Sequence, residues 1–154
     1  MEAETNTFHL PTGEATITLE DVAYIYGLPI DGEPVTGRTF NNAFVPKVCK
    51  ELLGLAPRPG KDTIRVTIKF KWLEENFKPS KKRNEVCKTR AYLFFLVSGQ
   101  IFANSSGARG PAWQLELFRE FKSYAWGPAC LASLYRMLAR ATRLLRGGED
   151  EEDK

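Results

Sequence analysis

Residues 7–37 read TFHLPTGEATITLEDVAYIYGLPIDGEPVTG, and no other stretch of this 154-residue chain contains so many legible structural signals. A turn signal at residues 11–13 separates two short segments in which apolar and polar residues alternate. The first segment contains Phe8 and Leu10, and the second contains Ala15 and Ile17. The pattern predicts a small β-hairpin with one buried face.

A helix is predicted directly after the hairpin. Thr18 is a favourable N-cap, and Asp21 stands three residues later, which is close to a capping box. The apolar residues at 19, 22, 23 and 26 form one stripe at helical spacing. Gly27 should end the helix, and Pro29 should prevent its continuation.

Further elements follow along the chain. Residues 63–72 alternate strictly between apolar and polar side chains, which favours a strand. Residues 104–111 are rich in Gly and Ser and are predicted to be a linker. Helical patterns occupy residues 42–55, 84–102, 112–122 and 127–147, the second being a buried core helix. We therefore expect a mainly α-helical fold, a single domain of five or six helices with a small N-terminal β-hairpin.

The composition suits a folded domain in a reducing compartment. Apolar residues make up 43% of the chain and aromatic residues 12%, which is enough for a hydrophobic core. The three cysteines are far apart and the chain has one histidine, so neither a disulfide framework nor a zinc site is expected. The sequence predicts neither a secretory signal nor a membrane partner, because no apolar run approaches the roughly 20 residues of a membrane span.

Charge is divided unevenly along the chain. Residues 1–37 contain seven acidic residues and no Lys or Arg, and residues 149–154 contain five acids and Lys154. The body between them carries 21 basic residues against seven acids. Such a body is attracted to polyanions or to its own acidic ends.

No catalytic constellation is apparent. His9 lacks neighbours that would make it a general base, so a structural role at the hairpin is expected. The Gly-rich residues 105–110 lack the lysine of a phosphate-binding loop. No lysine is marked out for a Schiff base. We predict a protein that is not an enzyme, with no catalytic residues, no metal site and no cofactor.

Two basic groups are candidate contacts. The first, Lys78, Lys81, Lys82 and Arg83, suits a nuclear-import signal or a phosphate contact, and equally a solvated loop. The second, Arg136, Arg140 and Arg143, falls on one face of the last helix. That face could follow a nucleic-acid backbone, bind a partner, pair with the acidic ends or remain solvated.

Three blocks in order resemble the plant mobile domain, the family of MAIN-like proteins that is also labelled aminotransferase-like. They are residues 7–37, the stretch RAYLFFLVSGQIFANSSG at 90–107, and SYAWGPACLASLYR at 123–136. The resemblance implies a structural role for a set of motif residues: Phe8, Leu10, Pro11, Gly13, Leu19, Asp21, Val22, Gly27, Leu28, Pro29, Gly32, Trp72, Tyr92, Trp126, Gly127 and Tyr135. It also implies that the unit WLEENF at 72–77 lies on a helix, with only residues 64–68 extended.

Family members usually continue through a second, helical half. The expected organisation is therefore a disordered acidic N-terminus (1–6), a partial plant mobile domain (7–146) and a disordered acidic tail (147–154). If the second half covers part of this one, apolar surface should be exposed on the last helix, opposite its arginines.

The resemblance implies a non-catalytic nuclear module that acts through protein–protein assembly. The associated roles are silencing of transposable elements, genome integrity and meristem maintenance. The expected partner is a nuclear protein of the same silencing pathway, with a phosphatase-like protein as a candidate. Two alternatives stay open: sequence-nonspecific nucleic-acid binding by the basic body, and an inactive transposon-derived remnant.

Overall fold

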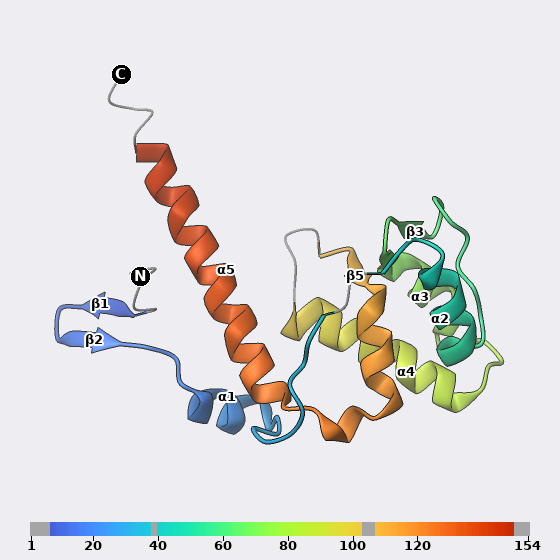
Figure 1. The fold of residues 1–154 in the computed structure, drawn as a ribbon, viewed down its shortest axis with the longest axis horizontal. Coiled ribbons are helices and arrows are strands. Elements are labelled where there is room, and N and C mark those ends of the chain that lie inside the picture. Colours follow the sequence, from blue (N-terminus) through green and yellow to red (C-terminus); the bar gives the residue numbers. More distant parts are fainter. Residues whose placement is uncertain (1–6, 38–39, 103–106, 150–154) are drawn as a thin grey trace. The chain divides into compact units, whose positions relative to one another are not determined.

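The computed structural model describes residues 7–37, 40–102 and 107–149. The chain divides into two compact units, and each is described by itself. Unit 1 comprises Met1–Pro34 and Ala125–Lys154, and unit 2 comprises Val35–Tyr124. The predicted mainly helical fold with a small N-terminal hairpin is confirmed (Figure 1).

Unit 1 contains the hairpin, a short helix and the longest helix of the chain. Strands β1 (Phe8–Leu10) and β2 (Gly13–Ala15) pair antiparallel, with Phe8 opposite Ala15. Helix α1 (Leu19–Tyr26) packs against α5 (Trp126–Glu149), drawn in blue and orange-red in Figure 1. The prediction that the hairpin has a buried face is wrong, because its side chains are exposed apart from a half-buried Phe8.

The predicted boundaries of α1 are confirmed in atomic detail. The Thr18 hydroxyl accepts a hydrogen bond from the Asp21 backbone at 3.2 Å, and the Asp21 carboxylate accepts one from the Thr18 backbone at 2.8 Å. This reciprocal pair is a capping box. Gly27 ends the helix with φ +62°, a left-handed conformation that glycine adopts at low cost.

Unit 2 combines helices with a small sheet. Its helices are α2 (Phe44–Leu53), α3 (Phe70–Phe77) and α4 (Glu85–Leu96). A π-helical turn (Val97–Ile101) continues α4, and two 3₁₀ segments (Ala112–Arg119 and Phe121–Ser123) follow later. The antiparallel sheet has the order β3 (Thr63–Ile64), β4 (Thr67–Lys69) and β5 (Arg109–Pro111).

The core of unit 2 is formed by apolar side chains from all of these helices. The most deeply buried are Val45, Val48, Cys49, Leu53, Ile68, Ala91, Phe94, Ala112 and Leu115, each at most 2% exposed. Phe70 contacts the rings of Phe94 and Phe95 edge-on. The helix implied for residues 72–77 is confirmed, since α3 buries both Trp72 and Phe77.

Four local predictions for unit 2 differ from the structure. Residues 63–69 form a hairpin, and part of the predicted linker at 104–111 is strand β5, because its backbone pairs with β4; residues 104–106 of that linker lie outside the described residues. The helix at 112–122 is of the tighter 3₁₀ type. Helix α4 is only half buried, with Tyr92 63% and Phe95 38% exposed.

Helix α5 extends slightly further than predicted. It continues through Gly147 and Gly148 to Glu149, because a glycine inside a helix costs about 1 kcal/mol and does not by itself end it. The predicted disorder at residues 1–6 and 150–154 lies outside the described residues. Among the described residues, no helix has both the length and the apolar character needed to cross a membrane.

Candidate interaction surfaces

The motif residues at the two ends of the chain meet in unit 1. The Gly127 backbone donates a hydrogen bond to the Pro29 carbonyl at 2.9 Å. A Cβ at residue 127 would stand 3.2 Å from that oxygen and 3.5 Å from the Leu19 side chain. The Tyr135 hydroxyl donates to the Ile17 carbonyl. These contacts hold α5 against the segments that precede and follow α1. Two motif blocks that are far apart in the sequence therefore meet in the fold.

The remaining motif residues divide by burial. Val22, Trp72 and Trp126 are each at most 5% exposed, as a structural role requires. Tyr92 is 63% exposed, because the buried stripe of α4 runs through Ala91 and Phe94. The motif therefore contains at least one side chain available at the surface.

An apolar surface lies at the end of α1, and we call it the α1 patch. It comprises Tyr24, Ile25, Tyr26 and Ile30, which are 91%, 72%, 59% and 45% exposed. Exposed acids stand before and after it in the sequence, at Glu20, Asp21, Asp31 and Glu33. Sequence reasoning missed this patch. Its signal was the run of three large apolar residues on an eight-residue helix, which cannot all face one neighbour.

Little of the apolar surface predicted on α5 is found among the side chains that the structure describes there, residues 126–143. One large apolar side chain among those described on this helix is exposed, Met137, at 37%. Exposed apolar side chains are concentrated on α1 and α4 instead. Arg136, Arg140 and Arg143 are exposed on α5, as predicted, and we call them the arginine face.

The four residues of the basic loop between α3 and α4 have different surroundings. Lys78, Lys81 and Lys82 are exposed. Arg83 is half-buried: its Nε donates to the Asn76 carbonyl at 2.9 Å, and its guanidinium lies 5.4 Å from the centre of the Phe77 ring. Arg83 therefore anchors the loop, and the three lysines remain exposed at the surface.

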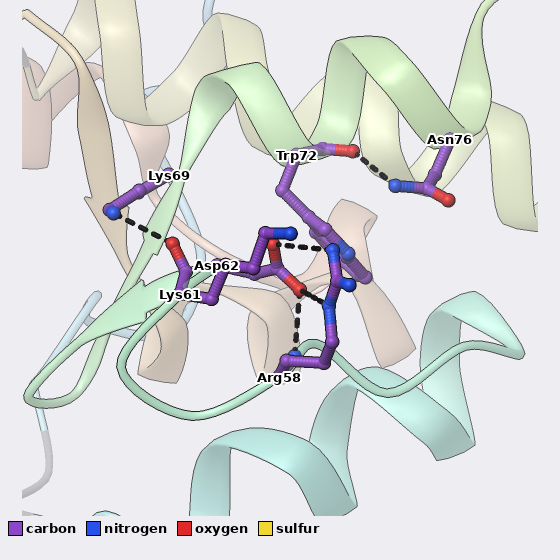
Figure 2. Close-up of polar contacts among 6 residues, drawn as sticks. All are labelled: Arg58, Lys61, Asp62, Lys69, Trp72 and Asn76. Carbon is purple, nitrogen blue, oxygen red and sulfur yellow. Dashed lines mark hydrogen bonds and ion pairs between the residues drawn. The ribbon is translucent and has the colours of Figure 1, made fainter.

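A charged network supports the loop before β3. The Asp62 carboxylate, 8% exposed, accepts hydrogen bonds from the Arg58 backbone and the Arg58 Nε, both at 2.9 Å (Figure 2). The Arg58 side chain and backbone hold the pKa of Asp62 below its ordinary value, against the effect of burial. Lys69 Nζ donates to the Lys61 carbonyl at 2.7 Å. The loop is thus fixed from both ends.

Two of the three cysteines, Cys49 and Cys130, are core residues. Cys49 is fully buried, and burial raises the pKa of its thiol to about 12. Cys130 is 7% exposed, and its pKa is also raised by burial. Cys87 is half-buried on α4. Within the described part of the chain, no three His, Cys, Asp or Glu side chains gather as a metal site requires.

Comparison with known proteins assigns the family. Residues 2–147 match the plant mobile domain, so the chain belongs to this family. It is 42% identical over 147 residues to Arabidopsis thaliana Protein MAIN-LIKE 1, covering 90% of this chain and 29% of that protein. It is 42% identical to Arabidopsis Protein MAINTENANCE OF MERISTEMS, covering 91% and 30%.

A third relative carries a different name. The chain is 43% identical over 148 residues to the Arabidopsis serine/threonine-protein phosphatase 7 long form homolog, covering 91% of this chain and 11% of that protein. The chain thus spans less than a third of each of these relatives. No solved structure matches it significantly.

Proposed function

We propose that this chain is a non-catalytic nuclear module that assembles with another protein through the α1 patch. The observation that carries the proposal is the exposure of four large apolar side chains on one short helix and the turn after it. Exposed aromatic and aliphatic side chains of this kind mark interaction sites on proteins. The raised pKa values of Cys49 and Cys130 argue against either thiol as a catalytic nucleophile, because a nucleophilic cysteine needs a lowered one.

The patch suggests the chemistry of the partner. Because four exposed acids flank it in the sequence, we expect an apolar partner segment that also carries Lys or Arg. The proposed partner is a nuclear protein of the silencing pathway, and a phosphatase-like protein is the first candidate. The roles proposed for the assembly are transposon silencing, genome integrity and meristem maintenance, the last in keeping with the name of one relative.

The test is calorimetric titration with the purified Arabidopsis phosphatase 7 long form homolog. Binding should persist at about 0.3 M salt, because apolar contacts are not screened as charges are. The variant Tyr24→Ser/Ile25→Ser should weaken it at least tenfold. Tyr92→Ser, which removes an exposed aromatic ring from α4, is the matched control and should bind like the parent.

The titration can contradict the proposed interface, the proposed partner or the assembly proposal as a whole. Equal binding by the parent and the Tyr24→Ser/Ile25→Ser variant would show that the α1 patch is not the interface. Absence of binding by the parent would reject the phosphatase-like partner. If no MAIN-like relative bound either, the alternative of an inactive transposon-derived remnant would replace the assembly proposal.

Nuclear localisation is part of the same proposal, and the lysines of the basic loop are its proposed signal. The chain should be fused to a reporter too large to diffuse through the nuclear pore. Lys81→Gln/Lys82→Gln should reduce nuclear accumulation of the fusion. Lys47→Gln/Lys50→Gln removes two exposed lysines from α2 and should leave accumulation unchanged.

A second candidate function is sequence-nonspecific nucleic-acid binding. It is favoured by the charge of unit 2, where 17 Lys and Arg residues face seven Asp and Glu residues. Such a balance attracts phosphate, and the affinity should fall steeply with salt. Anisotropy titration of a labelled 20-base-pair duplex at 50 and 200 mM salt tests it, and equal affinity at the two concentrations would reject it.

A further inference from the structure

The outward face of the β3–β4–β5 sheet places two cations side by side. Ile68, at the middle of β4, is fully buried, so its neighbours Thr67 and Lys69 point to the opposite face. On β5, Gly110 lies against the Phe94 and Ser98 side chains, so Arg109 also faces outward. Lys69 and Arg109 are direct partners in the antiparallel register.

Such an arrangement attracts anions. The Cβ atoms of directly opposite residues lie about 4.5–5.5 Å apart, so the two basic side chains start from neighbouring points on the sheet. An anion at this face would be attracted by both side chains. The Lys69 ammonium is already held at the sheet by the Lys61 carbonyl, so little side-chain freedom remains to be lost on binding (Figure 2).

Two further basic residues lie in the loop before β3 and in the β3–β4 turn. Lys61 is exposed in the loop before β3, and Arg65 is exposed in the turn between β3 and β4 with φ +51°. Residues 58–71 contain five basic residues and one acid. That acid is Asp62, whose carboxylate is buried and hydrogen-bonded to Arg58. No exposed carboxylate therefore comes from this stretch of the chain.

The outward face also lacks the aromatic side chains on which the bases of single-stranded nucleic acids stack. Its outward residues, as the register gives them, are Ile64, Thr67, Lys69, Arg109 and Pro111. None of these is aromatic, so bases would find no ring on which to stack. The chemistry favours the phosphate backbone of a duplex, which demands charge and no base contact.

We propose that the outward face of this sheet is the nucleic-acid contact of unit 2, with Lys61, Arg65, Lys69 and Arg109 on the phosphate backbone of a duplex. The proposal rests on the second candidate function and assigns it to one surface. It assigns the contact to the sheet and not to the other two basic groups, the basic loop and the arginine face.

The experiment measures how duplex affinity depends on salt. In the variant Arg65→Asn/Lys69→Gln/Arg109→Gln, Asn at residue 65 removes the charge and tolerates the left-handed backbone. Each lost phosphate contact lowers the slope of log affinity against log salt by about 0.9 in magnitude. The slope of the triple variant should therefore be smaller than that of the parent by about 2 to 3. A second variant, Lys61→Gln/Arg65→Asn, keeps the hydrogen bond from Lys69 to the Lys61 backbone carbonyl. Its slope should be smaller than that of the parent by about 1 to 2.

Two controls accompany these variants. Arg136→Gln/Arg140→Gln/Arg143→Gln removes the same charge from unit 1 and should leave the slope close to that of the parent. Lys69→Arg/Arg109→Lys keeps both charges and should bind like the parent. Thermal unfolding of every variant shows whether the fold is preserved.

The outcomes are distinguishable. If the parent does not bind the duplex, the second candidate function fails. If the parent binds and the triple variant keeps its slope, the function stands and the assignment to the sheet is wrong. If the arginine-face variant shows the smaller salt slope instead, the duplex contacts α5. Equal binding to anionic phosphatidylserine vesicles, lost in the same triple variant, would overturn the preference for nucleic acid.

Discussion

Gly110 and Ser98 lie so close together that residue 110 has no room for a side chain. A Cβ at this position would stand 2.5 Å from the Ser98 Cβ and 2.9 Å from the Phe94 ring. Both neighbours are almost fully buried, and the Ser98 hydroxyl donates to the Gln114 side chain. Strand β5 therefore reaches the core of unit 2 only because its central residue is glycine.

Gly110→Ala should destabilise the protein by about 1 to 3 kcal/mol, because the extra methyl overpacks a closed site. Urea unfolding measures the change. Gly99→Ala is the matched control, since a Cβ there would make ordinary contact with Phe70 at 3.5 Å. Equal stability of the two alanine variants would contradict the close approach.

Thr18→Ala should destabilise the protein by about 1 kcal/mol through loss of the α1 cap. Thr18→Ser should keep most of the stability, because serine retains the hydroxyl that accepts from the Asp21 backbone. Thr12→Ala, at an exposed turn, serves as the control. The free energy of unfolding from urea titration provides the comparison, and similar losses for Thr18→Ala and Thr12→Ala would argue against the cap.

Asp62→Ala should cost about 1 to 3 kcal/mol at neutral pH, because the buried carboxylate accepts charged hydrogen bonds from Arg58. The folded-state pKa of Asp62 is lowered, so its contribution is complete above the unfolded-state pKa of about 3.9. It is then lost as the pH falls through the folded-state value.

The difference in unfolding free energy between parent and Asp62→Ala should therefore be constant above about pH 5 and shrink below about pH 4. Urea titrations between pH 2 and pH 7 measure it. Glu74→Ala removes an exposed acid from α3 and is the control. A difference that grows towards low pH would contradict the lowered pKa.

Cys87 should react with iodoacetamide at pH 8 before the other two cysteines do. Cys49 is fully buried with a pKa of about 12, and Cys130 is 7% exposed with a raised pKa, so neither offers an accessible thiolate. Mass spectrometry of the labelled protein gives the order of reaction. In urea all three should react, and a Cys49 that is labelled as fast as Cys87 in the folded protein would refute the burial.

Local signals in the sequence determined where most helices begin and end. The capping box of Thr18 and Asp21 and the αL glycines Gly27 and Gly54 act within a few residues of their own position. Asn84 likewise caps α4 by accepting from the Val86 backbone. The three motif blocks also indicated the family, which the match of residues 2–147 to the plant mobile domain confirms.

Only the tertiary structure decided which surfaces are exposed and which segments pair. Strand β5 forms because its backbone finds β4, some 40 residues earlier, and no signal within a Gly- and Ser-rich stretch specifies that partner. The same applies to the Lys69–Arg109 pair, which exists only through the register. The exposure of Tyr24 and Tyr92 depends on where neighbouring elements pack, and hydrophobicity alone predicted Tyr92 to be buried.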